Sequence, residues 1–544
     1  MRRLKAMLAT GLLLLSGTAS VATAAPAQAL ENGVGRTPPM GWNSWNTFFC
    51  NINESLIRGM ADSIVSSGMR AAGYEYVVVD DCWMNPNRDS SGNLQGDPTR
   101  FPSGMKALGD YLHSKGLKFG IYQAPLDKTC AQYFGSYPGA TGSQGHEAQD
   151  ARQFAAWGVD YLKYDWCSPA GTIGEQVTTF AKMRDALAAT GRPILYSINS
   201  NSVHAKTGPQ RDWGDVANIW RTTEDIQLTW NTDQTNGYPM GVQNIINVNV
   251  PLAAYAEPGG FNDPDMMEVG RGTLTDTEQR SHFAMWAVMA APLIAGNDIR
   301  SMTAATRTIL QNPRLIAINQ DSLGLQGVQV AGDADQRVLA KRLSNGDVAV
   351  ALFNQSGATR TITTSAAAIG KSGATSYALT EAWSGATTTT GGAISASVPA
   401  HGTVVYRVAG GTTGEPPAPA SGNLVSTSSG RCLDVPNSNT TNGTQPVVWD
   451  CGTAANQKWT VSGQTLQALG KCLDAPIGAT AGTKVQIWDC NGGTNQQWTF
   501  QANGTVRGNQ SGLCLDVTNN QTANGTLTLL WSCTGATNQQ WTRR

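Results

Sequence analysis

"VDYLKYDWC", residues 159–167, is the stretch on which the fold assignment depends. It is a short apolar run, rich in residues that favour strands, and it closes on an aspartate beside a cysteine. A carboxylate at the end of a buried strand is costly unless a partner or a ligand stabilises it. Lys163 lies two residues before Asp165, and alternate strand residues share a face. We therefore expect a buried strand that ends on a lysine and an aspartate facing the same way.

Seven more strand-like apolar runs occur along the first part of the chain. They cover residues 40–45, 74–81, 118–123, 193–199, 218–225, 259–265 and 291–296. Segments with helical spacing separate the first six of the eight strands, and another covers residues 276–290. Eight strands that alternate with helices favour a parallel barrel, the (β/α)8 or TIM barrel architecture, over an open sheet. We assign residues 30–326 to this barrel.

The rest of the chain follows other patterns. Residues 327–409 alternate Val, Thr, Ala and Gly with little helical periodicity, which predicts a small antiparallel β-sandwich domain. A Gly- and Pro-rich linker covers residues 410–422. Residues 423–544 then repeat three times with a period near 40. Each copy holds one cysteine pair: Cys432 with Cys451, Cys472 with Cys490 and Cys514 with Cys533. Three such copies predict a closed, three-fold all-β unit.

The first 29 residues are typical of a cleaved secretory signal, with basic residues, an apolar run at 12–15 and an alanine-rich tail. That run is shorter than the roughly 20 residues of a spanning helix, so we expect a secreted protein and no membrane partner. Ten cysteines, an even number, fit disulfides in an exported chain. A net charge of −1 does not favour a nucleic acid partner. No Cys-x-x-Cys pair occurs and the five histidines are scattered, so no metal site is expected.

Polar and aromatic side chains collect at the C-terminal ends of the predicted strands, where parallel barrels build active sites. They are Trp45, Asp80, Asp81, Tyr122, Lys163, Asp165, Asn199, Arg221, Asp225, Asp263 and Asp265. A single strand-end aspartate is often a helix N-cap. Several carboxylates together with aromatic and cationic side chains are harder to explain as caps, so this end of the barrel is the candidate active site.

Two carboxylates flanking one bond are what glycoside hydrolysis requires. Lys163 would keep Asp165 ionised, which suits a nucleophile. Asp225 follows Arg221 on another strand end and is a strong candidate for the acid. The residue pattern itself does not choose between Asp225, Asp265 and Asp81 for that role.

Six motifs carry a resemblance that goes further: "MGWNSW", "VDDCW", "GIY…KTC", "FAAWGVDYLKYDWC", "WR…DI" and "GGFNDPDMMEVG". In this order, over residues 37 to about 325, they resemble the α-galactosidase and α-N-acetylgalactosaminidase family, glycoside hydrolase family 27. The resemblance implies that Asp165 is the nucleophile and Asp225 the acid/base. It also implies a sugar pocket and two disulfides. The pocket comprises Trp45, Asp80, Asp81, Tyr122, Lys163, Asn199, Arg221 and Asp265, and the disulfides are Cys50–Cys82 and Cys130–Cys167.

The mechanism implied by this resemblance is double displacement with retention and without a metal or organic cofactor. The two carboxyl groups should then lie about 5 to 5.5 Å apart, the spacing of retaining enzymes. One carboxylate should stay ionised while the pKa of the other is raised.

Two departures from the family pattern bear on the sugar. Ala124 stands where an aspartate is usual, and Asn199 stands where galactosidases keep a glutamate near O2. Small polar residues at 199–202 would admit a 2-acetamido group or simply reshape a loop. We expect a secreted exo-glycosidase that removes terminal α-D-galactosyl residues from oligo- or polysaccharides. α-N-Acetylgalactosaminidase, β-L-arabinopyranosidase and a catalytically dead lectin are the alternatives.

The C-terminal repeats resemble a ricin-B-type β-trefoil, the family 13 carbohydrate-binding module. The resemblance implies one sugar pocket per repeat, built from an aspartate, an aromatic residue and an Asn-Gln pair. These are Asp434, Trp449, Asn456 and Gln457; Asp474, Trp488, Asn495 and Gln496; and Asp516, Trp531, Asn538 and Gln539. An aromatic face suits sugar C–H groups and a carboxylate suits paired hydroxyls. The repeat-end residues Trp459, Trp498 and Trp541 are expected in the core instead.

Overall fold

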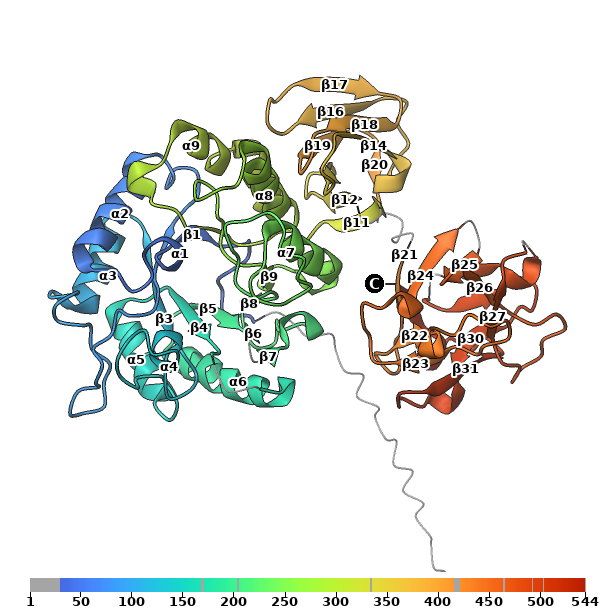
Figure 1. Ribbon diagram of the computed structural model, residues 1–544, viewed down its shortest axis with the longest axis horizontal. Helices are drawn as coiled ribbons and strands as arrows, with labels where there is room; N and C mark the ends of the chain where they lie inside the picture. The colour runs from blue at the N-terminus through green and yellow to red at the C-terminus, as the bar shows by residue number, and fades with distance from the viewer. Residues whose placement is uncertain are drawn as a thin grey trace, which may run out of the picture.

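A computed structural model of the chain describes residues 30–167, 171–202, 205–332, 335–414, 421–462, 465–491, 493–501 and 503–543 (Figure 1). The expected secretory signal, residues 1–29, lies outside the described residues, and so does the middle of the expected linker, residues 415–420.

Eight parallel strands form the first unit, in the spatial order β10-β1-β2-β3-β4-β5-β8-β9. They are β1 (Met40–Asn43), β2 (Tyr76–Val79), β3 (Lys118–Gln123), β4 (Tyr161–Asp165), β5 (Leu195–Asn199), β8 (Ile219–Arg221), β9 (Phe261–Asp263) and β10 (Leu293–Ala295). Just beyond β9, Met267 pairs in parallel with Ala295 of β10, and its N–H donates to Ile294 O at 2.8 Å. This bridge closes the sheet, so the predicted barrel is confirmed.

Helices cover the outside of the barrel (Figure 1). The longer ones are α2 (Glu54–Ser66), α3 (Gly104–Ser114), α5 (Glu147–Trp157), α6 (Ile173–Ala189), α7 (Val242–Asn249) and α8 (Asp276–Val288); the shorter ones are α1 (Trp45–Phe48), α4 (Cys130–Tyr133), α9 (Ala304–Leu310) and α10 (Pro313–Asn319). Capping boxes start α6 at Thr172 with Glu175 and α8 at Thr275 with Glu278. Each box satisfies backbone N–H groups that a helix start leaves unpaired.

The connection between β5 and β8 departs from the sequence prediction. A helical segment was expected there, but the described residues of this connection hold the hairpin β6 (Asn201–Ser202) with β7 (Ala205–Lys206) and the 3-10 turn η1 (Gly208–Gln210). The segment is mostly polar, and Pro209 with Gly208 opposes a longer helix. Between β8 and β9 the structure has the helix α7, although no helix was predicted there.

Strand alternation explains how the barrel separates its core from its polar end. Six residues from five strands pack together inside it: Tyr76, Val78, Tyr161, Leu195, Ile219 and Phe261. Two residues further along β4 and β8, on the same face, the chain places Lys163 and Arg221. The interior is therefore apolar toward the N-terminal ends of the strands and charged at their C-terminal ends.

The second unit is the predicted β-sandwich. One sheet has the order β11-β12-β13-β19-β16-β17 and a second pairs β14 with β18. The strands are β11 (Val328–Gly332), β12 (Gln336–Arg342), β13 (Val348–Asn354), β14 (Arg360–Ser365), β16 (Tyr377–Glu381), β17 (Thr387–Thr390), β18 (Ala393–Val398) and β19 (Thr403–Ala409), with a short pair β15 (Lys371–Ser372) and β20 (Thr412–Thr413). It packs on α8 of the barrel, where His401 Nδ1 lies 2.7 Å from Glu278 Oε1.

The third unit is the predicted trefoil, with its own apolar core. Its strands are β21 (Ser421–Ser426), β22 (Cys432–Asp434), β23 (Val447–Trp449), β24 (Lys458–Ser462), β25 (Thr465–Ala468), β26 (Lys471–Asp474), β27 (Gln486–Asp489), β28 (Trp498–Phe500), β29 (Val506–Gly508), β30 (Cys514–Val517), β31 (Thr526–Trp531) and β32 (Trp541–Arg543). Trp459, Trp498 and Trp541 are buried in that core, as expected, and each donates its indole N–H to a leucine carbonyl.

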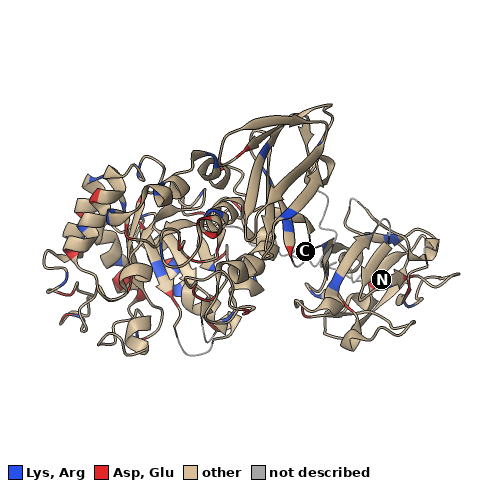
Figure 2. Ribbon diagram, turned by 45° about the horizontal axis from the view of Figure 1, so that its top comes forward, with Lys and Arg blue, Asp and Glu red and all other residues tan. Residues whose placement is uncertain are grey.

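Acidic and basic positions are interspersed over the barrel and are sparser in the two β units (Figure 2). This distribution agrees with a net charge of −1. Among the described helices, none combines the length and the apolar character that crossing a membrane requires.

Candidate active site

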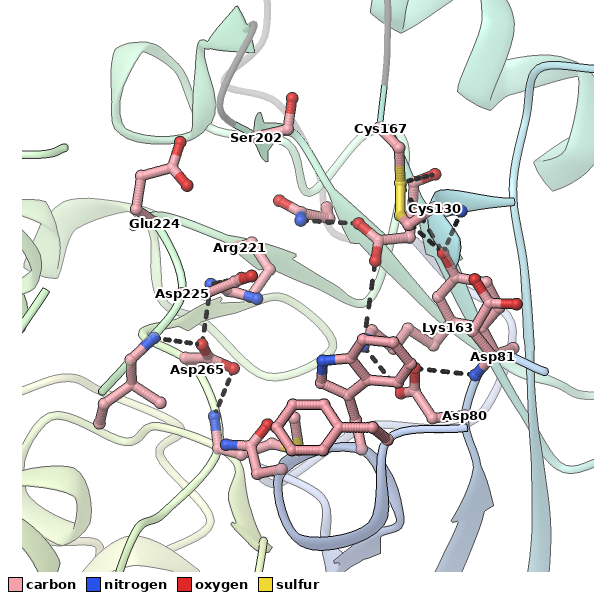
Figure 3. A pocket seen from close by; sticks show the side chains of 18 of the residues that line it. Asp80, Asp81, Cys130, Lys163, Cys167, Ser202, Arg221, Glu224, Asp225 and Asp265 are labelled. Carbon is pink, nitrogen blue, oxygen red and sulfur yellow. Dashed lines mark hydrogen bonds and ion pairs between the residues drawn. A yellow bond between two sulfur atoms is a disulfide. The ribbon is translucent and has the colours of Figure 1, made fainter. Parts of the chain in front are cut away.

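A cavity of about 540 Å³ opens at the C-terminal end of the barrel. All ten residues predicted for catalysis and substrate binding in the barrel line it: Trp45, Asp80, Asp81, Tyr122, Lys163, Asp165, Asn199, Arg221, Asp225 and Asp265. In Figure 3, Arg221, Asp225 and Asp265 lie on one side of the cavity, and Lys163, Asp80 and Asp81 lie on the other. Residues from seven strand ends thus converge on one space whose two sides are both charged.

Asp165 ends β4 and is buried. Asn199, beside it on β5, donates its amide to Asp165 Oδ1 at 2.7 Å, and Lys163 Nζ lies 4.0 Å from Oδ2. Burial raises the pKa of Asp165, and the nearby Asp225 adds to that effect, whereas Lys163 and Arg221 oppose it. The lysine and the arginine are therefore what favours the ionised form of this carboxyl group.

Lys163 lies between Asp165 and Asp80 and contacts both carboxylates. Its ammonium donates to Asp80 Oδ2 at 2.8 Å, and Asn43 donates to the same oxygen at 2.7 Å. Burial disfavours the charged form of Lys163, but Asp80 and Asp165 more than offset this and raise its pKa above the ordinary value. Lys163 consequently stays a cation between two carboxylates.

Asp81 is held by backbone. Its two oxygens accept hydrogen bonds from the N–H groups of Cys82 at 2.7 Å and Ala131 at 2.8 Å. Burial raises the pKa of Asp81 to about 7, against the effect of these bonds. Its orientation is fixed by the loops that follow β2 and β3.

Arg221, at the end of β8, holds the two remaining carboxylates. Its guanidinium lies 3.1 Å from Asp225 Oδ1 and 3.0 Å from Asp265 Oδ2. Asp265 also accepts from the N–H groups of Ile226 and Met266, at 2.9 and 2.7 Å. Asp225 differs, because its side chain is 56% exposed, against 12% for that of Asp165. Of the three candidates for the acid, Asp225 is thus the one at the mouth of the cavity.

Two disulfides frame the site. Cys50–Cys82 links the loops after β1 and β2, and Cys130–Cys167 fastens α4 to the residues that follow Asp165. Tyr122 adds to the second attachment, since its hydroxyl lies 2.7 Å from Cys130 Sγ. The bonded sulfurs of Cys130 and Cys167 cannot serve as thiolate ligands, although they lie close to Asp165.

Several cavity residues escaped the sequence prediction. Glu268 is buried and pairs with Arg271, and Glu224 pairs with Lys206. Glu268 lies within the quoted motif "GGFNDPDMMEVG", so it could have been found there. Three exposed aromatic side chains, Phe49, Phe134 and Tyr238, also line the cavity. Phe49 immediately precedes a predicted disulfide cysteine, but nothing in the neighbouring sequence indicated that its side chain would be exposed.

The trefoil repeats assemble the three predicted polar sets. One oxygen of each aspartate accepts two amides: Asn456 and Gln457 donate to Asp434, Asn495 and Gln496 to Asp474, and Asn538 and Gln539 to Asp516, all at 2.7 to 3.0 Å. In the second repeat Gln486, which sequence reasoning missed, donates to the other oxygen at 3.1 Å.

The tryptophans assigned to these trefoil pockets lie on the surface. Trp449, Trp488 and Trp531 are 39 to 48% exposed. The three repeat cysteine pairs, Cys432–Cys451, Cys472–Cys490 and Cys514–Cys533, all form disulfides. Each repeat therefore offers an exposed aromatic side chain and an aspartate oriented by two neutral amides.

Comparison with known proteins matches each unit separately. A family model described as alpha galactosidase A matches residues 37–321, one described as the alpha galactosidase C-terminal beta sandwich domain matches 333–408, and a ricin-type beta-trefoil lectin domain matches 420–541.

Individual relatives align over more than three fifths of the chain. The chain is 48% identical to alpha-galactosidase A of Cellvibrio japonicus over 340 residues, which are 62% of this chain and 80% of that protein. It is 45% identical to the alpha-galactosidase of Cyamopsis tetragonoloba over 377 residues, 69% of this chain and 87% of that one. The crystal structure of alpha-galactosidase I from Mortierella vinacea superposes with a TM-score of 0.66 at 35% identity, covering 71% of this chain and all of that one.

Proposed function

The chain belongs to the alpha galactosidase A family, and we propose that it is a secreted, retaining exo-glycosidase that hydrolyses terminal α-D-galactosyl residues. The observation that carries this proposal is the single cavity in which a buried Asp165 and an exposed Asp225 occupy different environments. Export is supported by the signal-like first 29 residues and by the five disulfides.

The reaction proceeds in two displacements. Asp165 attacks the anomeric carbon while Asp225 gives its proton to the glycosidic oxygen, so the C–O bond to the leaving group breaks and a covalent glycosyl-Asp165 forms. Asp225, now a carboxylate, takes a proton from water. That water attacks the anomeric carbon, releases Asp165 and completes retention. The carboxyl separation of about 5 to 5.5 Å that this route requires stays a prediction.

The remaining cavity residues bind the sugar. Asp80, Asp81 and Lys163 form a polar wall for an axial O4 and for O6, with Trp45 as its aromatic neighbour. Arg221 and Asn199 bind near O2, and Asp265 holds Arg221 in place. The α-galactosidase relatives favour galactose over N-acetylgalactosamine or L-arabinopyranose as the glycone.

The trefoil binds sugar in the same substrate. Its exposed tryptophans and amide-oriented aspartates suit the faces and hydroxyls of exposed sugars. Holding the enzyme on a galactose-bearing polysaccharide raises the local concentration of cleavable residues.

Product stereochemistry tests the proposal. Hydrolysis of an aryl α-galactoside, followed by proton NMR, should give α-galactose first and its β anomer only later by mutarotation. Initial release of the β anomer would contradict the retaining mechanism. A panel with aryl α-N-acetylgalactosaminide and β-L-arabinopyranoside tests the glycone, and faster turnover of either would overturn the assignment to galactose.

A further inference from the structure

We propose that His401 of the sandwich is a positioning residue for Asp225, because its ring holds the loop that carries this proposed acid. The inference rests on the proposed function, since it gives His401 a part in the proton transfer that Asp225 performs. The loop connects β8 to α7 and covers residues 222–241. We call it the acid loop. Of the described residues that line the cavity, none belongs to the sandwich, so the sandwich acts on the site from outside.

The acid loop has one side on the cavity and another on the sandwich. Residues 225–228 line the cavity. Trp230, two residues further along, is only 7% exposed. Its ring stacks on that of His401, with 4.8 Å between the ring centroids and 15° between the planes. The segment that presents the acid to the substrate is therefore held five residues later by a ring from another unit.

Aromatic packing is what holds Trp230 on the sandwich. Phe353, on β13, meets the Trp230 ring edge-on at 6.0 Å, so the indole contacts two rings of the sandwich. The buried indole N–H has no hydrogen-bond partner within the part of the chain that the structure describes. On the barrel side, the N–H of Gln243 in α7 donates to Trp230 O at 2.8 Å. Removal of the His401 ring takes away one of these attachments and leaves the others.

His401 is itself fastened to the barrel. Its Nδ1 lies 2.7 Å from Glu278 Oε1, and its carbonyl oxygen accepts the hydroxyl of Ser281 at 2.6 Å. Both partners belong to α8, and the other oxygen of Glu278 accepts the N–H of Thr275 in the capping box that starts this helix. The His401 ring is thus a fixed support between α8 and the acid loop.

The backbone of the acid loop transmits this support to Asp225. The N–H of Gln227 donates to Met240 O at 2.8 Å, and the N–H of Met240 donates to Asp225 O at 3.4 Å, so the two ends of the loop are paired. The Asp225 side chain is 56% exposed and contacts Arg221. Its direction therefore depends on the backbone that carries it. A misplacement of about 1 Å can lower a rate about a hundredfold.

The experiment compares two substrates that share the galactosyl group but differ in their need for an acid. Melibiose has a leaving alcohol that needs a proton, whereas dinitrophenolate leaves without one. The full chain is tested with His401→Gly and His401→Asn. The φ angle of His401 is 57°, a left-handed conformation that glycine and asparagine both adopt readily. Asparagine keeps a polar group for Glu278, and neither replacement keeps the ring.

Two further variants complete the set. Asp225→Asn gives the effect of losing the acid itself. Ser281→Ala is the matched control, because it removes a contact between α8 and the sandwich without touching Trp230. The readout is the ratio of kcat/KM for melibiose to kcat/KM for dinitrophenyl α-galactoside, together with the melting temperature.

We expect this ratio to fall about five- to fiftyfold in both His401 variants, a part of the about 10²- to 10⁴-fold that general acid catalysis provides. The change should have the same direction as in Asp225→Asn. Ser281→Ala should lower the melting temperature and leave the ratio unchanged. A loss that depends on the leaving group is not expected from a residue that only stabilises the fold.

Two results would overturn the inference. One is an unchanged ratio in both His401 variants. The other is an equal loss on both substrates with a lowered melting temperature, which would make the stack on Trp230 a structural contact only. Failure of Asp225→Asn to separate the two substrates would instead contradict the proposed acid itself, so the two failures are distinguishable.

Discussion

Aspartates of the barrel and aspartates of the trefoil are set in opposite surroundings. In the barrel, Asp165 and Asp80 flank the ammonium of Lys163. In the trefoil, Asp434 accepts two neutral side-chain amides and forms no ion pair with any residue that the structure describes, and burial raises its pKa. Burial raises the pKa of Asp165 too, but in the barrel Lys163 opposes that rise and so favours the ionised carboxylate that a nucleophile needs. The trefoil arrangement only fixes the direction of an acceptor, which is sufficient for binding a hydroxyl.

The aromatic side chains of the two units also serve different purposes. In the barrel, aromatic side chains extend the pocket wall from Trp45 to Phe49. In each trefoil repeat one tryptophan, such as Trp459, is buried in the core and another, such as Trp449, is exposed. Chemistry in one unit and adhesion in the other should therefore respond differently to the same substitutions.

The largest difference between the barrel and the trefoil is expected when one aspartate of each is replaced by asparagine. Asp165→Asn removes the nucleophile at nearly constant volume, so kcat for an aryl α-galactoside should fall by about 10⁴-fold or more. Retention on a galactose-bearing polysaccharide should persist, measured by pull-down of the full chain. Asp434→Asn is the matched variant in the trefoil. If Asp165→Asn kept more than a hundredth of the activity, the nucleophile assignment would be wrong.

A second test separates the two carboxylates of the barrel. Asp225→Asn removes the proton donor, and general acid catalysis is typically worth about 10²- to 10⁴-fold. The loss should be large for melibiose, whose leaving alcohol needs a proton, and much smaller for a dinitrophenyl α-galactoside. Equal losses on both substrates, measured as kcat/KM, would exclude Asp225 as the acid and return attention to Asp265 and Asp81.

The sequence predicted these assignments unevenly. The eight strands were recognisable as short apolar runs, and several of these runs close on polar residues, as at Asp80 and Asp165. The residue pattern left the choice of acid open, and only the family resemblance pointed to Asp225. Asp81 and Asp265 differ from Asp225 in backbone contacts and exposure, which depend on loops far apart in the chain. Phe49 was missed for a related reason: neither its φ angle nor its exposure follows from residue type.

The misread connection between β5 and β8 has a local cause. Helical spacing was predicted for this segment, which is mostly polar and contains Gly208 and Pro209. The polar, Gly- and Pro-containing composition of this connection argued against a helix, and the structure agrees with the composition.

A third test concerns charge in the barrel. Lys163→Met removes a cation that lowers the pKa of Asp165. The pKa of the free carboxyl group should therefore rise, and the acidic limb of kcat/KM against pH should move to higher pH by about one unit or more. Lys471→Met is the trefoil counterpart, because Lys471 pairs with the exposed Asp489. It should leave the profile in place, and a shift toward lower pH in Lys163→Met would contradict the proposed role.

The smallest effect is expected from removing one exposed tryptophan of the trefoil, because three similar repeats share the binding of polysaccharide. Trp449→Ala should weaken binding to a galactose-bearing polysaccharide about two- to tenfold, the range for one aromatic contact, because the other two repeats still bind. The melting temperature should hardly change, since Trp449 is half exposed. Trp459→Ala is the contrasting variant: it empties a core position and removes the hydrogen bond to Leu433 O, so it should lower the melting temperature. If Trp449→Ala destabilised the protein as Trp459→Ala does, its ring would be a packing element, and the trefoil pockets would have to be sought elsewhere on the repeats.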